Sequence, residues 1–271
     1  MNASHCKAIL LLGFPFLFSA CQPSPISATG TASIPGFIRR LSETGCAQDG
    51  SIGESSVPNP PHGFPIKFQY YLPPCYDKLA SHSFPTVYFI LADFETRLSE
   101  TDHMPISSAN RLIRADKIPP AILVVPEPVL GVGFHVSLAE DLVPRVDGLF
   151  RTIRNRRFRE VGGYSHTAAI AARMAFQYPG LIGGVGVFSG GIAPSEIPQF
   201  ETWVGETPKE FWPRVFFDIG DQDPIIVLTR NLTGVLDRHH VPYDFHRAAG
   251  GHGDNFSVQM ESYLLWFAAP W

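Results

Sequence analysis

Short apolar runs alternate along the chain with segments that have helical spacing. Six runs have the length and composition of strands, at 66–72, 86–92, 121–127, 184–190, 214–220 and 242–248. The runs at 86–92 and 121–127 are apolar throughout, as expected of strands that helices cover on both faces. Helical stripes occupy 107–118 and 137–153, and we expect Pro144 to kink the second helix or to begin a turn there. Repeated units of this kind predict an α/β fold, a mostly parallel central sheet flanked by helices on both faces.

The first 36 residues have a different character from the rest. Lys7 precedes the apolar run AILLLGFPFLF, which is too short to span a membrane and contains Pro15, so 1–20 is predicted to be a signal peptide. The run ends in FSAC, and small residues before Cys21 are typical of bacterial lipoproteins, in which that cysteine is lipidated. A plain secretory signal with an incidental Cys21 is the alternative. Residues 21–36 have the Pro, Ser, Thr and Gly composition of a flexible tether.

The remaining residues, 37–271, are predicted to form one domain, because a chain of 271 residues with 45% hydrophobic content can bury a single sizeable core. The formal net charge of −4 gives no basic field, so no nucleic-acid partner is expected. Five arginines fall between Arg151 and Arg159, either on a solvated helix end or loop or around an anion.

The number and spacing of the cysteines and histidines indicate whether a disulfide or a metal site is expected. With Cys6 removed and Cys21 lipidated, Cys46 and Cys75 remain, and an oxidising exterior would let them form a disulfide. Two buried free thiols are the alternative. No zinc-binding spacing occurs among the cysteines and histidines, so neither a metal nor a cofactor is predicted.

Polar residues with catalytic potential follow two of the apolar runs and a further short strand that ends at 161–163. Ser165 stands between a short strand and an alanine-rich helix, Asp221 and Asp223 follow 214–220, and His252 follows 242–248. The carboxyl ends of parallel strands are where active sites gather. The chain order of serine, aspartate and histidine is that of the α/β-hydrolases.

These residue types suit nucleophilic catalysis. A serine hydroxyl needs a histidine to accept its proton, and a carboxylate holds that imidazole in the required tautomer. The strand-to-helix turn aims the first helical N–H groups at a developing oxyanion, and it requires small residues two before and two after the serine. Gly163 meets this requirement, whereas the branched Thr167 is expected to crowd the turn.

Most of the chain after residue 66 resembles the esterase branch of the α/β-hydrolase superfamily, which includes esterase D-type enzymes, enterochelin esterases, feruloyl and acetylxylan esterases and mycolyltransferases. The matching segments are YYLPPCY, FPTVYFIL, IPPAILVVPE, EDLVPRVDGLFRT, GGYSHTAAIAARMAFQYPGLIGGVGVFSGG, DIGDQD, and GGH before YLLWFAAPW.

The resemblance implies a serine esterase of the α/β-hydrolase fold. It implies Ser165 as the nucleophile, His252 as the base and Asp223 as the acid, with the backbone N–H groups of His166 and Phe94 forming the oxyanion hole. Asp221 is the alternative acid, because capping of the helix that begins at Pro224 would also explain Asp223.

Three positions depart from the pattern. Asp93 stands where the family has glycine and would repel an oxyanion if its carboxylate pointed inward, while Thr167 replaces the second glycine of the elbow. Glu160 precedes a buried strand and needs a partner such as a nearby arginine. Asp218, within a strand, is expected to be structural.

The segment from Ile192 to Trp212 is too short for a large lid domain, so the cleft should be open to bulky or sugar-linked esters. Trp203 and Trp212 fall in this segment and either line a pocket or pack on the core. The predicted protein is an exported, membrane-anchored or secreted esterase whose partner is its ester substrate. An acyltransferase with the same triad, and a surface binding protein that has lost catalysis, are the alternatives.

Overall fold

The structure is a computed structural model, and it describes residues 36–271 except 59, 62–64, 92–103, 130–132 and 257. The predicted leader, Cys21, Asp93 and Phe94 lie outside the described residues. Eight strands form one sheet in the order β1-β2-β4-β3-β5-β6-β7-β8. The strands are β1 (Ser51–Val57), β2 (Ile66–Leu72), β3 (Thr86–Ile90), β4 (Ile122–Pro126), β5 (Arg159–Tyr164), β6 (Gly184–Phe188), β7 (Arg214–Gly220) and β8 (Asp244–Ala248).

The sheet is mostly parallel, as predicted. Strands β3 to β8 pair in parallel, and only β1 and β2 run antiparallel to their neighbours. The β3, β4 and β6 strands are buried along their whole length, which explains their continuous apolar sequences. β1 was not predicted, because SIGESSV is polar and lies exposed at the edge of the sheet.

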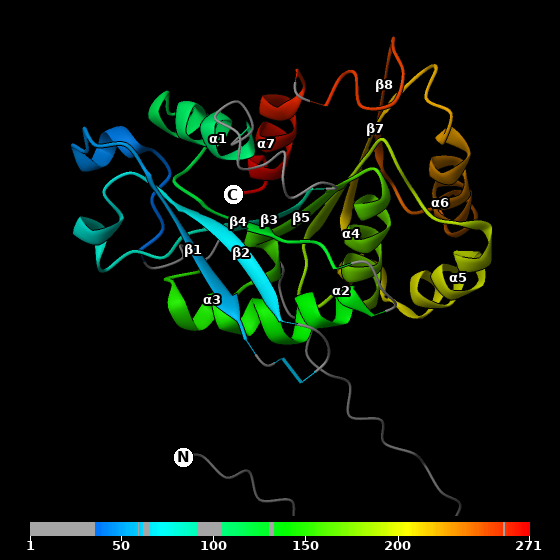
Figure 1. The fold of residues 1–271 in the computed structure, drawn as a ribbon, viewed down its shortest axis with the longest axis horizontal. Coiled ribbons are helices and arrows are strands. Elements are labelled where there is room, and N and C mark those ends of the chain that lie inside the picture. The colour runs from blue at the N-terminus through cyan, green and yellow to red at the C-terminus, as the bar shows by residue number, and fades with distance from the viewer. Residues whose placement is uncertain (1–35, 59, 62–64, 92–103, 130–132, 257) are drawn as a thin grey trace, which may run out of the picture. The chain divides into compact units, whose positions relative to one another are not determined.

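Helices cover both faces of the sheet (Figure 1). The α1 and α7 helices pack together on one face, while α4 lies against β5 and β6 on the other face, with α2 and α5 beside it. The α-helices are α1 (Met104–Arg114), α2 (Phe134–Ser137), α3 (Val143–Leu149), α4 (His166–Gln177), α5 (Ile197–Glu206), α6 (Ile226–His239) and α7 (Met260–Ala268). Short 3₁₀ turns are η1 (Leu41–Thr44), η2 (Tyr76–Leu79), η5 (Arg156–Phe158), η6 (Pro194–Glu196) and η7 (Lys209–Phe211).

The stripe predicted over 137–153 is divided where Pro144 falls. A π-helical segment, η4 (Leu138–Leu142), joins α2 to α3, and Pro144 lies in the first turn of α3. Proline lacks the N–H that an interior helical position would use, so it fits the start of a helix. Leu142 and Val146 face the core, whereas Leu149 at the helix end is exposed.

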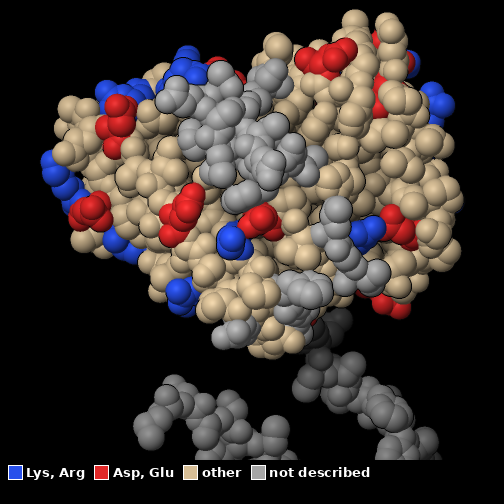
Figure 2. All heavy atoms as spheres, viewed as in Figure 1, with Lys and Arg blue, Asp and Glu red and all other residues tan. Residues whose placement is uncertain are grey.

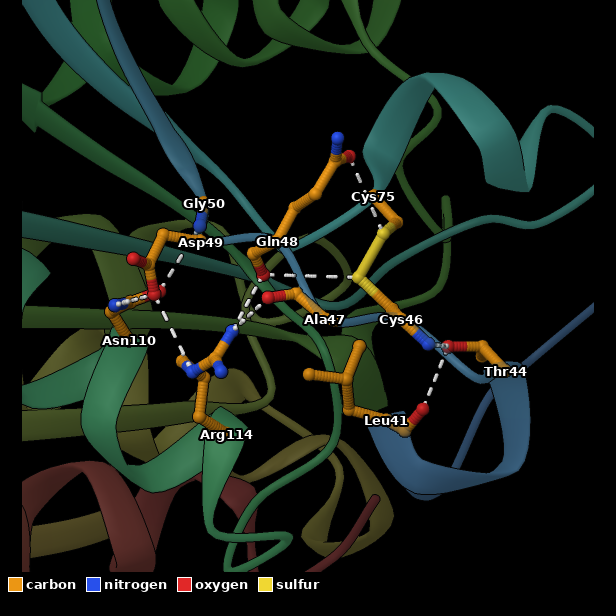
Figure 3. Close-up of a disulfide and its surroundings, with 10 residues drawn as sticks. All are labelled: Leu41, Thr44, Cys46, Ala47, Gln48, Asp49, Gly50, Cys75, Asn110 and Arg114. Atoms are coloured by element: carbon orange, nitrogen blue, oxygen red, sulfur yellow. Dashed lines mark hydrogen bonds and ion pairs between the residues drawn. A yellow bond between two sulfur atoms is a disulfide. The ribbon is translucent and has the colours of Figure 1, made fainter.

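A disulfide joins Cys46 to Cys75 and ties the segment before β1 to the turn after β2 (Figure 3). The same segment is held to α1, because Arg114 donates hydrogen bonds to the carbonyl oxygens of Ala47 and Gln48 at 3.1 and 2.8 Å. The amino-terminal part of the domain is therefore fixed covalently and by hydrogen bonds against the sheet. Among the described helices, none combines the length and apolar character that crossing a bilayer requires.

Candidate active site

Ser165 occupies the sharp turn between β5 and α4. Its backbone has φ 59° and ψ −128°, a conformation that non-glycine residues rarely adopt and that is typical of a strained nucleophile elbow. The Ser165 N–H donates to the carbonyl oxygen of Phe188 in β6 at 2.9 Å, which anchors the turn to the neighbouring strand. Gly190 lets the next loop approach, since a Cβ there would lie 2.4 Å from the Ser165 carbonyl oxygen.

The residues two before and two after Ser165 fit the turn in different ways. A Cβ on Gly163 would lie 2.3 Å from the Thr167 carbonyl oxygen, so glycine is required there. Thr167 does not crowd the turn, contrary to the prediction. It is fully buried, and its Oγ1 accepts a hydrogen bond from the Tyr164 N–H at 3.0 Å and lies 2.6 Å from the Ile90 carbonyl oxygen at the end of β3. The hydroxyl thus uses the space that a glycine would leave open.

Ser165, His252 and Asp223 are brought together in one hydrogen-bonded chain. His252 Nε2 lies 2.9 Å from Ser165 Oγ, and His252 Nδ1 lies 2.9 Å from Asp223 Oδ2. The Asp223 side chain is fully buried and its Oδ1 accepts the Ile225 N–H at 3.0 Å, so the carboxylate is fixed in position. The imidazole is therefore oriented by Asp223 with its second nitrogen at the serine hydroxyl.

Asp221, the alternative acid, has a different position. It is exposed, and its Oδ1 accepts the Gly250 N–H at 3.1 Å while the Gln222 N–H donates to the Gly250 carbonyl oxygen at 2.9 Å. These contacts tie the loop after β7 to the loop that carries His252. In the structure, Asp223 and not Asp221 reaches the imidazole.

An aromatic side chain next to the serine borders the imidazole, and the sequence pattern did not single it out. The Tyr164 ring stacks on His252 with a centroid distance of 5.6 Å and packs on Phe256 at 4.3 Å. A Cβ on Gly253 would fall 1.9 Å from the Tyr164 hydroxyl oxygen, so the glycine admits the ring. The only signal in the sequence was the position of Tyr164 between Gly163 and the serine.

The amino terminus of α4 supplies donors beside Ser165. The N–H groups of His166 and Thr167 are the first of the helix and have no intrahelical carbonyl partner. They carry the positive end of the helix dipole, which favours negative charge. The His166 side chain is exposed. The predicted second donor, Phe94, and the departure at Asp93 lie outside the described residues.

The arginines between Arg151 and Arg159 bind protein groups. Arg159 forms a buried ion pair with Asp147 at 2.8 Å, and Arg156 donates to the Pro179 carbonyl oxygen at 2.6 Å. The others donate to backbone carbonyl oxygens, Arg151 to Tyr76 and His82, Arg154 to Asp147, and Arg157 to Pro270. They act as structural connectors, and on the face shown in Figure 2 positive and negative side chains are interspersed.

Two further carboxylates have structural positions. Asp218 is buried in β7 and pairs with His246 of β8, as expected of a residue within the sheet. Glu160 is 1% exposed at the other end of β5, and neither of its oxygens has a hydrogen-bond partner among the described residues. Burial raises the pKa of Glu160 to about 8, although the charges of Arg214 and Arg156 lower it. The predicted arginine neighbours are present, but they make no ion pair with Glu160.

The two tryptophans of the 192–212 segment lie in separate pockets. Trp203 of α5 lines one with His135 and Arg173, and Trp212 lines another with Arg214 and Trp266. Neither Ser165 nor His252 lines these two pockets. In the part of the chain that the structure describes, no group of three or more His, Cys, Asp or Glu side chains could hold a metal ion.

Solved structures of esterases have the same architecture at low sequence identity. A ferulic acid esterase superposes with a TM-score of 0.69 at 14% identity, covering 83% of this chain and 100% of its own. An S-formylglutathione hydrolase from Staphylococcus aureus superposes with a TM-score of 0.62 at 12% identity, covering 82% of this chain and 97% of its own. A ferulic acid esterase from Anaeromyces mucronatus superposes with a TM-score of 0.64 at 17% identity, covering 82% of this chain and 92% of its own. No family model matches the chain, and no curated protein matches it in sequence.

These likenesses cover 82–83% of the chain, and they establish the fold. The chain has an α/β-hydrolase fold, as its sequence predicted, with a mostly parallel sheet of eight strands. The 192–212 segment holds α5 and two 3₁₀ turns in place of a large lid domain.

Proposed function

We propose that this protein is a serine hydrolase that cleaves carboxylic esters through an acyl-enzyme intermediate. The observation that carries the proposal is the chain of hydrogen bonds from Asp223 through His252 to Ser165, at the turn where β5 enters α4. An ordinary turn serine does not need a histidine backed by a buried carboxylate. The esterases of similar fold agree with this assignment.

In the proposed reaction, Ser165 Oγ attacks the ester carbonyl carbon while His252 Nε2 accepts the hydroxyl proton. Collapse of the tetrahedral intermediate breaks the bond to the alcohol oxygen, which takes the proton from the imidazolium. Water then attacks the acyl-enzyme with His252 again as base, and the carboxylic acid leaves. Asp223 stays ionised throughout, holds the tautomer with the proton on Nδ1, and stabilises the imidazolium.

The developing oxyanion would be stabilised at the start of α4. The His166 N–H follows the nucleophile directly, in the position from which α/β-hydrolases donate their first oxyanion hydrogen bond. We assign the second donor to the Phe94 N–H. An Asp93 carboxylate that pointed inward would oppose the oxyanion, whereas one that pointed to solvent would leave the Phe94 N–H able to donate.

The proposed setting is outside the cytoplasm, on a protein tethered through Cys21 or secreted. The disulfide between Cys46 and Cys75 supports an oxidising compartment. The proposed substrates are bulky or sugar-linked esters, because the insert at 192–212 is too short for a large lid domain that would enclose a small substrate. Transfer of the acyl group to a sugar hydroxyl would use the same intermediate, and product analysis with an added alcohol distinguishes transfer from hydrolysis.

The test is labelling of the full chain with a fluorophosphonate probe, followed by mass spectrometry, beside Ser165→Ala. One probe molecule per chain at Ser165, absent in the variant, is the expected result and justifies a screen of feruloyl, acetyl and sugar esters. Absence of labelling in protein that is shown to be folded would refute the proposal. It would point to a binding protein that retains the fold without catalysis.

A further inference from the structure

A pocket that the proposed reaction does not use is lined by residues of α2, α4, η6 and α5. Its volume is about 440 Å³. Two of its walls, Arg173 and Gln177, belong to the second half of α4, roughly 12 and 18 Å along the helix from Ser165. The pocket is therefore separate from the triad while sharing a rigid element with it.

An aromatic ring forms one wall of this pocket. Trp203 of α5 is half-buried, and its ring packs edge-on against the buried Phe200 at a centroid distance of 5.1 Å. The His135 ring of α2 lies 6.4 Å from the Trp203 ring. Because Trp203 lines the pocket and is held by its contact with Phe200, it contributes an ordered apolar surface to the pocket.

An ion pair between Arg173 and Glu196 forms a second part of the lining, and its charges cancel. Glu196 Oε1 accepts a hydrogen bond from Arg173 Nε at 2.6 Å, and Glu196 Oε2 accepts the Ala193 N–H at 2.9 Å. The pair is fixed and has no net charge, so it does not favour an anion. It offers guanidinium donors and carboxylate acceptors side by side, which suits a ligand whose groups both donate and accept.

The remaining wall contains a histidine with an unpaired nitrogen. His135 is 9% exposed, its Nε2 lies 2.7 Å from Gln177 Oε1, and its Nδ1 has no partner among the described residues. Burial lowers the pKa of His135, so the ring is neutral at pH 7. With Nε2–H donating to the amide oxygen, the Gln177 amide N–H groups remain donors, whereas Nδ1 is buried away from solvent.

From this arrangement we infer that the pocket is a second site, distinct from the triad, that binds a neutral pyranose unit of an oligosaccharide. A sugar ring has an apolar face of C–H groups that packs on Trp203. Its equatorial hydroxyls both donate and accept, which matches the Arg173–Glu196 pair and the Gln177 amide. The site would hold the glycan part of a substrate or of the cell surface independently of ester cleavage.

The test is calorimetric titration of the full chain with unsubstituted oligosaccharides, which contain no ester bond for the triad to cleave. The probes are xylohexaose, cellohexaose and, as an anionic counterpart, trigalacturonic acid. The expected result is saturable binding of at least one neutral hexasaccharide. Trp203→Ala should weaken it about tenfold, the loss expected for one aromatic packing contact.

Matched variants separate a lost site from a lost fold. Gln199→Ala removes an exposed side chain of the same pocket and should weaken binding several-fold without changing the melting temperature. Trp212→Ala, in the other pocket, should leave the affinity unchanged. The inference is overturned if no oligosaccharide binds, if only trigalacturonic acid binds, or if neither Trp203→Ala nor Gln199→Ala changes the affinity. Each result is independent of esterase activity.

Discussion

The buried carboxyl of Glu160 makes the stability of the domain depend on pH in a direction that can be tested. Glu160 lies near the amino end of β5, and Arg214 and Arg156 are its charged neighbours. Both carboxyl oxygens are shielded from solvent and unpaired among the described residues. Desolvation outweighs the two positive charges, so the pKa rises from its ordinary value of 4.5 to about 8 and the group is protonated at neutral pH.

The sign and the magnitude follow from proton linkage. Between pH 4.5 and 8 the folded chain retains a proton that the unfolded chain has lost, so the free energy of unfolding falls as pH rises. The slope is about 1.4 kcal/mol per pH unit inside that window. From pH 5 to pH 7.5 Glu160 should therefore cost roughly 3 kcal/mol of stability. Below pH 4.5 both states are protonated and the contribution no longer changes.

The perturbation that isolates this effect is Glu160→Gln, which keeps the shape and removes the titration. Urea unfolding of wild type and variant at pH 5, 6, 7 and 7.5 gives the difference in stability at each pH, and other titrating groups cancel. The free energy of unfolding of the variant, relative to that of the wild type, should rise by roughly 3 kcal/mol from pH 5 to pH 7.5. Glu206→Gln, at an exposed position of α5, should run parallel to the wild type. A difference between wild type and Glu160→Gln that does not change with pH would refute the reasoning.

Three other substitutions test separate parts of the structure. Thr167→Val should lower the free energy of unfolding by about 1–3 kcal/mol and reduce turnover, because the Tyr164 N–H loses its acceptor. Thr167→Ser keeps the hydroxyl and should retain the stability and the turnover of the wild type. Urea unfolding measures the stability, and ester hydrolysis measures the turnover. Asp223→Asn should reduce kcat about 10³–10⁴-fold with an unchanged melting temperature, and an unaffected kcat would refute its assignment as the acid. Replacing Cys46 and Cys75 by serine should lower the free energy of unfolding by about 3–4 kcal/mol, and equal stability with and without the bond would contradict its role.

The sequence predicted the fold well where burial controls composition. The runs at 66–72 and 214–220 match β2 and β7 residue for residue, because most positions of these strands are buried and most of the buried positions are apolar. The polar edge strand β1 escaped prediction, since an exposed strand needs no hydrophobic pattern. The division of the 137–153 stripe into α2, η4 and α3 depends on how the chain accommodates Pro144, which periodicity does not encode.

The candidate site was predictable in its membership and less so in its contacts. Ser165, Asp223 and His252 were predicted from their places after strands and from the family resemblance. In the structure, His252 lies within hydrogen-bond distance of both Ser165 and Asp223. The choice between Asp223 and Asp221 depended on which carboxylate turns inward, a matter of the turn after β7. The stacking of Tyr164 on the imidazole depends on tertiary packing alone, so no local pattern indicated it.

Thr167 shows how a departure from a family pattern can be a different solution to the same requirement. Read from the sequence, its branched side chain favoured a protein that has lost catalysis. In the structure its hydroxyl holds the Tyr164 N–H and contacts the Ile90 carbonyl oxygen, linking the nucleophile turn to the end of β3. A side chain that ties the Ser165 turn to the end of β3 gives no support to a degenerate site, so the binding-protein alternative rests on Asp93 alone.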